Sequence, residues 1–118
     1  MAGGSAMGSL AFTTRLEAGV TVLGIGGVID TGVAPQFEAE MKKAVGGVGK
    51  YVGDCSGLEH ITSAGIGVLI AMKNAIQSSG GTFVMAGVSE KIMKVFSMLN
   101  LDKLVRIYGT VGEAVKAI

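Results

Sequence analysis

The polar residues best placed to do chemistry in this chain lie around position 60. They run from Asp54 and Ser56 to Thr62 and Ser63, and an apolar segment follows them. Because apolar residues recur at helical spacing beyond Ser63, this serine is predicted to lie at the start of a helix. Free backbone N–H groups and the helix dipole favour negative charge there. Ser63 is therefore a candidate for modification by phosphate, which would add charge as a switch.

The simplest role for a serine at a helix start is that of an N-cap, which needs no further function. The helix itself is predicted from Ser63 to about Ser78, where Gly80 and Gly81 end it. At 100° per residue, Ser63 lies on the solvent-facing side of the helix. The opposite, core-facing side is formed by Gly65, Val68, Leu69, Met72, Ala75 and Ile76.

Two isoleucines are predicted on that solvent-facing side of the helix. Ile66 and Ile70 flank Gly67, and together they would form an apolar patch for a docking partner. The alternative is that both isoleucines pack beneath a loop.

Composition limits the classes of function. The chain has 118 residues, of which 49% are hydrophobic and 16% are charged, and its formal net charge is +1. This composition argues for one folded domain and against disorder, and the absence of a basic cluster argues against nucleic-acid binding. No apolar run approaches the length of a membrane span, and no signal peptide is expected. One cysteine and one histidine argue against a zinc site, and a lone cysteine suits the cytoplasm.

The remaining elements alternate between strand and helix. Strands are expected over 11–16, 20–26, 51–55, 82–86 and 105–108, and Gly27–Gly32 is expected to break the second of these. Helices are expected over 34–45, after Ser89 with Ile92, Val95, Phe96 and Leu99 on one face, and after Thr110. Residues 1–9 have no apolar period and are expected to be a leader or disordered tail. The order predicts an α/β domain over residues 10–118, with a mixed sheet of four to five strands.

Other motifs have simpler explanations. Gly24-Ile25-Gly26-Gly27 lacks the spacing and the lysine of a nucleotide loop, so it indicates a glycine-rich strand end. Cys55 is expected to be a small buried residue and His60 to lie in a surface loop. Asp30 and Asp54 could act as an acid–base pair, but no histidine, lysine or metal set accompanies them. The chain is therefore expected to be neither an enzyme nor a cofactor-binding protein.

The combined motifs resemble the STAS domain family, and most closely the bacterial anti-sigma factor antagonists. The resemblance rests on Asp54-x-Ser56, on Ser63-x-Gly65-Ile66-Gly67-Val68-Leu69, and on Gly27-Val28-Ile29-Asp30. It extends over roughly residues 10–118 and implies helices largely on one side of the sheet.

The resemblance implies roles for particular residues. Ser63 matches the serine that a partner kinase phosphorylates, Asp30 and Asp54 match acidic positions near it, and Ser56 matches a hydroxyl after the strand. Unphosphorylated members bind an anti-sigma factor that is also their kinase, and thereby release a sigma factor for transcription. A phosphatase resets them. The patch of Ile66, Gly67 and Ile70, which follows from helix geometry and not from the resemblance, would be the docking surface.

The chain departs from this pattern beside the acceptor serine. Thr62 stands where close relatives commonly have aspartate, and Ala64 stands where serine or threonine is frequent. Thr62 removes a negative charge and is itself a competing acceptor. The departure leaves open a second function, in which the domain is a structural STAS subunit of a transporter or a stressosome-like assembly.

Overall fold

The structure is a computed structural model that describes residues 10–46 and 48–118. Its strands are β1 (Leu10–Glu17), β2 (Val20–Ile29), β3 (Lys50–Asp54), β4 (Leu58–Ile61), β5 (Thr82–Ala86) and β6 (Ile107–Tyr108). Its helices are α1 (Ala34–Ala44), α2 (Ser63–Ser78), α3 (Glu90–Met98), α4 (Leu101–Leu104) and α5 (Val111–Ala117). The leader predicted over residues 1–9 lies outside the described residues.

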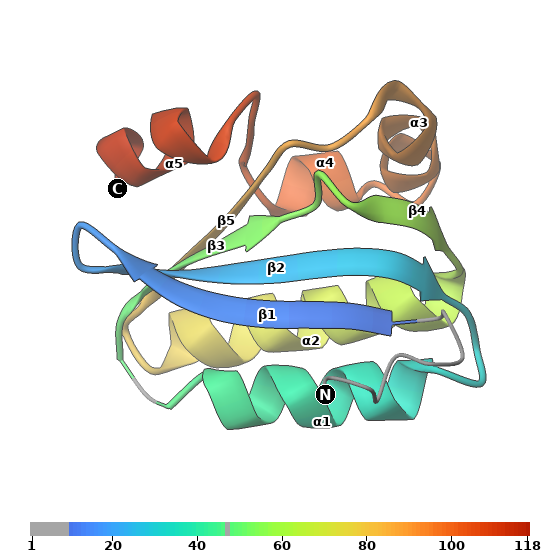
Figure 1. The fold of residues 1–118 in the computed structure, drawn as a ribbon, viewed down its shortest axis with the longest axis horizontal. Helices are drawn as coiled ribbons and strands as arrows, with labels where there is room; N and C mark the ends of the chain where they lie inside the picture. Colours follow the sequence, from blue (N-terminus) through green and yellow to red (C-terminus); the bar gives the residue numbers. More distant parts are fainter. Residues whose placement is uncertain (1–9, 47) are drawn as a thin grey trace.

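One mixed sheet organises the domain (Figure 1). Its order is β1-β2-β3-β5-β6, and β4 pairs with β2 beyond the end of β3. The β1–β2 hairpin is antiparallel, and the other pairs are parallel. Parallel strands must be joined by crossovers, which is why helices follow β2, β4 and β5.

The sheet of the described residues has six strands, one more than the largest predicted number. The extra strand is β4, which continues along β2 after β3 has ended at Asp54. This pairing also corrects the predicted end of β2. Gly27–Ile29 was expected to break the strand, but Leu58, His60 and Ile61 of β4 provide its partners, with a register shift between Gly27 and Val28.

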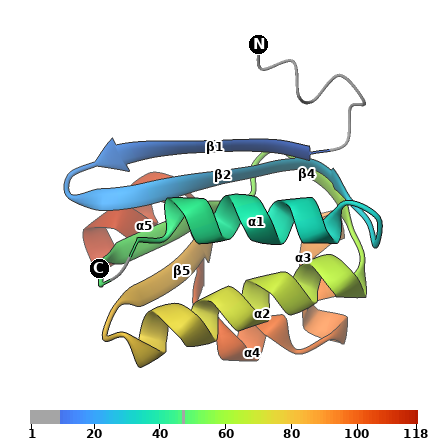
Figure 2. The ribbon, with the colours of Figure 1, turned by 90° about the horizontal axis from the view of Figure 1, so that it is seen from below.

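The two faces of the sheet are covered unequally. Alternate side chains such as Leu23, Ile25 and Met85 point into a large core that α1, α2, α3 and α4 close. The opposite set, including Val52 and Val84, packs against Ala114 of α5. Figure 2 shows α1 and α2 on one side of the sheet and α5 on the other. The predicted α/β fold with helices largely on one side is confirmed.

The segment after β5 differs in detail from the prediction. Ser89 caps α3 as expected, since its hydroxyl accepts a hydrogen bond from the N–H of Ile92 at 3.2 Å. Ile92 and Phe96 are buried, but Leu99 is 43% exposed. The reason is that α3 ends at Met98 and Asn100 adopts a left-handed conformation, so the chain turns into α4 and Leu101 occupies the core instead.

Candidate functional site

Ser63 is the first residue of α2, as the apolar spacing predicted. Thr62 precedes it in extended conformation and occupies the N-cap position, without a capping hydrogen bond from its side chain. Ser63 is therefore not the cap. The first helical bond here runs from the N–H of Ile66 to the carbonyl of Thr62 at 3.1 Å. The N–H groups of the first turn point out of the helix end, and the Ser63 side chain is exposed beside them.

The two neighbouring hydroxyls have opposite environments. The Thr62 Oγ1 atom is buried and has no hydrogen-bond partner within the described residues. Its backbone N–H donates to the carbonyl of Ile29 at 3.0 Å, which fixes Thr62 at the end of the parallel β2–β4 pair. Of the two candidate acceptors, only Ser63 is an exposed residue.

Asp30 lies at the same carboxyl end of the strands as Ser63, because it follows β2 and Ser63 follows β4 closely. It directly follows Ile29, the residue whose carbonyl binds Thr62. Its Oδ1 accepts a hydrogen bond from the N–H of Val33 at 3.0 Å, and its carbonyl accepts one from the N–H of Ala34 at 2.9 Å. Asp30 therefore secures the start of α1, and the starts of α1 and α2 meet where β2 and β4 end.

Asp54 and Ser56 do not lie at the carboxyl end of β2 and β4. Asp54 is opposite Gly24 on β2, whereas Thr62 binds Ile29, five residues further along the strand. At about 3.3 Å per residue this separation is roughly 17 Å. The group of polar residues expected around Ser63 is therefore divided between two places: Asp30 and Thr62 are near the acceptor, and Asp54 and Ser56 belong to a second site.

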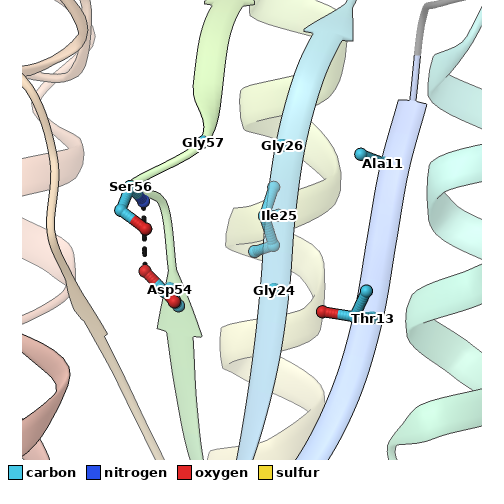
Figure 3. Close-up of a pocket in the computed structure, with 8 residues that line it drawn as sticks. All are labelled: Ala11, Thr13, Gly24, Ile25, Gly26, Asp54, Ser56 and Gly57. Atoms are coloured by element: carbon cyan, nitrogen blue, oxygen red, sulfur yellow. Dashed lines mark hydrogen bonds between the residues drawn. The ribbon is translucent and has the colours of Figure 1, made fainter.

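The second site is a shallow recess on the open face of the sheet, of about 220 Å³ (Figure 3). Backbone of Gly24 and Gly26 forms part of its lining, and Thr13, Asp54 and Ser56 contribute polar side chains. Asp54 Oδ1 accepts a hydrogen bond from the N–H of Ser56 at 3.1 Å. A Cβ atom at position 24 would collide with the Thr13 hydroxyl, so glycine there lets β1 and β2 pair closely.

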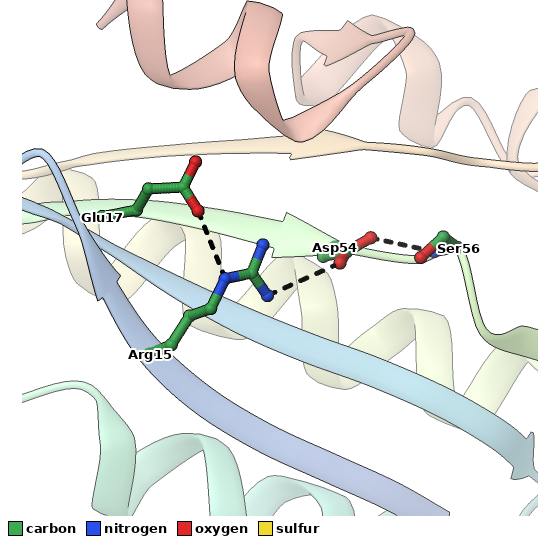
Figure 4. Close-up of polar contacts among 4 residues, drawn as sticks. All are labelled: Arg15, Glu17, Asp54 and Ser56. Carbon is green, nitrogen blue, oxygen red and sulfur yellow. Dashed lines mark hydrogen bonds and ion pairs between the residues drawn. The ribbon is translucent and has the colours of Figure 1, made fainter.

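Arg15 joins this site from the edge strand (Figure 4). Its Nε contacts Glu17 Oε1 at 3.2 Å, and its Nη1 lies 3.9 Å from Asp54 Oδ2. Thr13 and Arg15 were missed in the sequence, where only the alternation of β1 indicates that they share a face. Cys55 is buried as predicted, and burial, with a smaller contribution from the Asp54 charge, raises its pKa to about 12. Such a thiol is not a nucleophile at neutral pH.

The predicted apolar patch on α2 is wrong for Ile66, one of its two isoleucines. Ile66 is 2% exposed and belongs to the core, and Ile70 is half-buried against the same core. The reason is that α2 contacts α1, α4 and β5, so more than one side of the helix is covered. Gly67 is exposed as expected. Together with Ser63, Ala71 and Asn74 it forms a narrow exposed strip along α2.

Within residues 10–46 and 48–118, no group of three His, Cys, Asp or Glu side chains could hold a metal ion. His60, expected in a loop, is an exposed residue of β4. None of the described helices has the length and apolar character needed to cross a membrane.

Known proteins resemble this chain in both sequence and structure. The family model described as the STAS domain matches residues 11–114. A Thermotoga maritima protein named "Putative anti-sigma factor antagonist" is 40% identical over 63 residues, which are 53% of this chain and 56% of that protein. A Thermotoga neapolitana homologue is 35% identical over the same share of each chain. The matched stretch thus spans a little over half the length of these relatives.

Solved structures extend the likeness over nearly the whole domain. A crystal structure of a Thermotoga maritima protein with the same description has a TM-score of 0.78 and 29% identity, covering 91% of this chain and 93% of the other. An anti-sigma factor antagonist from Mycobacterium paratuberculosis has a TM-score of 0.84 and 25% identity, covering 93% and 94%.

Proposed function

The chain belongs to the STAS domain family, and from this membership we propose that it is an anti-sigma factor antagonist controlled by phosphorylation of Ser63. In this proposal the unmodified domain binds an anti-sigma factor that is also a serine kinase, in the cytoplasm. Phosphate on Ser63 ends the binding, and a phosphatase restores it. The protein acts by binding rather than by catalysis, and its relatives named as anti-sigma factor antagonists support this role.

The observation that carries the proposal is the contrast between two adjacent hydroxyls. Ser63 is exposed at the first residue of α2, whereas the Thr62 Oγ1 atom is buried. A kinase needs an accessible oxygen to transfer phosphate, so Thr62 does not compete with Ser63 in the folded protein. The substitution of the usual aspartate by Thr62 therefore leaves the acceptor itself intact.

The helix start explains how phosphate could switch binding without unfolding the domain. A phosphoserine carries about −1.5 to −2 charges at pH 7, and a helix N-terminus stabilises negative charge there. Docking of a partner would have to remove water from that charge, which is costly unless a cation compensates it. The modified domain would therefore stay folded but lose its partner.

The docking surface in this proposal is the exposed strip of α2 rather than an isoleucine patch. It begins at Ser63 and continues through Gly67 and Ala71, with half-buried Ile70 along its border. A Cβ atom at Gly67 would have nothing within 4 Å, so a partner backbone could approach closely. Ile66 contributes from beneath, by holding this part of α2 on the core.

Incubation with ATP and a candidate anti-sigma factor kinase, followed by intact mass measurement, tests the acceptor. We expect the Ser63→Ala variant to lose the added phosphate and the Thr62→Val variant to retain it. Phosphate retained in Ser63→Ala would reject the assignment.

A binding measurement separates the switch from the alternative of a structural STAS subunit in a transporter or stressosome-like assembly. We expect Ser63→Asp to weaken the kinase complex while leaving the unfolding transition nearly unchanged. A structural subunit would instead bind its assembly equally well with Ser63, Ala or Asp at this position. The departure at Thr62 is the feature that favours this alternative.

A further inference from the structure

Among the described residues, β1 is the terminal strand of the sheet (Figure 1). In the part of the chain that the structure describes, β1 pairs with β2 alone. All eight residues from Leu10 to Glu17 keep a continuous register without a bulge, and none is proline. Edge strands of this length present a row of backbone donors and acceptors, which proteins commonly protect with bulges, prolines or covering segments.

The side chains of β1 carry a projection and a recess on the same face. Leu16 is 75% exposed, and strand alternation places it on the side of Phe12 and Thr14. Phe12 is half-buried, and its ring packs edge-on against Phe37 of α1 with 6.3 Å between the ring centroids. Phe12 lines a recess of about 270 Å³ between β1 and α1, together with Thr13, Thr14, Glu40, Lys43 and Ala44.

We propose that this edge binds a second copy of the chain, with the two β1 strands antiparallel about a two-fold axis at Thr14. Antiparallel pairing about residue 14 brings residue 16 of each copy opposite residue 12 of the other. The exposed Leu16 of one copy would then cover the Phe12 recess of the other, twice per dimer. The two sheets would join into one through backbone hydrogen bonds.

The charges at the recess fit the same axis. Glu38 and Lys42 of α1 pair with each other at 3.3 Å, but no ion pair formed among residues 10–46 and 48–118 engages Glu40 or Lys43. Both line the recess together with Thr14. In the proposed dimer, Glu40 of each copy pairs with Lys43 of the other.

A surface with these properties favours its own copy over an unrelated strand. Leu16, which projects, and Phe12, which lines the recess, lie two residues on either side of Thr14. A two-fold contact requires this kind of self-complementarity, because one patch must serve as both partners. On the opposite face of β1, the same register places Arg15 opposite Thr13 and Glu17 opposite Ala11, so no like charges lie directly opposite each other. The two Arg15 side chains are diagonal neighbours, and each contacts Glu17 and Asp54 of its own copy.

Sedimentation equilibrium of the full chain at concentrations up to about 1 mM tests the proposal. We expect the mass to rise from 11.9 kDa towards twice that value. Leu16→Lys should raise the dimer dissociation constant by at least about tenfold, because it removes the group that fills the recess. Met98→Lys is the matched control, since Met98 is 79% exposed on α3 and should leave the dimer unchanged.

Charge reversal and cross-linking locate the axis. Glu40→Lys should weaken the dimer, and addition of Lys43→Glu should restore it. Oxidised Thr14→Cys should form a disulfide-linked dimer, because opposite Cα atoms in an antiparallel pair are about 4.5–5.5 Å apart. Met98→Cys should not cross-link efficiently, and the native Cys55 is buried.

A protein that stays monomeric at the highest concentration overturns the proposal. So does a dimer that survives Leu16→Lys, or one in which Thr14→Cys fails to cross-link, because the contact would then lie on another surface. The readouts are independent of Ser63, so the result leaves the proposed function unaffected.

Discussion

Two glycines of α2 offer a sharp test of how the helix packs. Gly65 and Gly67 are two residues apart, and replacement by alanine adds one methyl group to each. At Gly65 the new Cβ atom would lie 2.7 Å from Ile61 Cγ1 and 2.9 Å from Ile29 Cγ2. At Gly67 it would have nothing within 4 Å. The same chemical change is therefore expected to have opposite effects on stability.

The magnitudes follow from the two environments. Alanine is favoured over glycine in a helix by up to about 1 kcal/mol, so Gly67→Ala should stabilise the domain by up to this amount. At Gly65 the contacted atoms belong to β-branched side chains buried between strand and helix, which cannot move aside freely. Overpacking there costs about 1–3 kcal/mol. After the helical gain of up to about 1 kcal/mol is subtracted, Gly65→Ala should destabilise the domain by up to about 2 kcal/mol.

Urea unfolding followed by circular dichroism measures both variants against the parent protein. In thermal unfolding, the midpoint temperatures of the two variants should also differ, by roughly 4 °C for each kcal/mol in a domain of this size. If Gly65→Ala were as stable as Gly67→Ala, α2 would not lie against Ile29 and Ile61 as the structure has it. The position assigned to Ser63, at the end of the same contact, would then be wrong as well.

Three further predictions concern the core and the second polar site. Ile66→Ala should cost about 2–5 kcal/mol in urea unfolding, whereas Ile70→Ala should cost clearly less because Ile70 is only half-buried; equal losses would contradict the burial assigned to α2. The Cys55 pKa is raised from 9.0 to about 12 in the folded state, so its contribution to stability is complete below pH 9 and is lost as the pH rises towards 12. Between pH 8 and pH 10, the free energy of unfolding should therefore fall by about 1 kcal/mol less in Cys55→Ala than in the parent. Parallel plots of this free energy against pH for the two proteins would disprove the effect of the Cys55 thiol. Arg15→Ala should cost less than about 1 kcal/mol, as is usual for exposed ion pairs, whereas Asp54→Ala should cost more because it also removes the hydrogen bond to the Ser56 N–H; the reverse order would refute these roles.

Local sequence signals determined much of the fold. The bounds of α2 and β5 were predicted from apolar periodicity and from the glycines between them. Thr110 caps α5 as expected, since its hydroxyl accepts a hydrogen bond from the N–H of Glu113 at 3.1 Å. These features depend on residues within one or two turns of each other, so the sequence contains the information needed to predict them.

Short elements that depend on a distant partner could not be predicted in this way. The four residues of β4 have no strong alternation, and they form a strand because β2 offers a free edge beyond β3. The same pairing extends β2 through Gly27, where φ is +83°, to Ile29. No local rule for turns or strands contains that edge.

The sequence by itself determined the α/β fold, the motifs and the place of Ser63 at the start of a helix. Only the tertiary structure decided which residues surround that serine. The helical spacing of 100° per residue predicted Ile66 to be exposed, because that prediction assumed one buried side of the helix. Neighbouring elements in fact cover α2 on more than one side. The motif placed Asp54 beside the acceptor because they are close in the chain, but strand register holds them apart along β2. Burial and register arise from contacts between distant segments, and these exist only once the chain has folded.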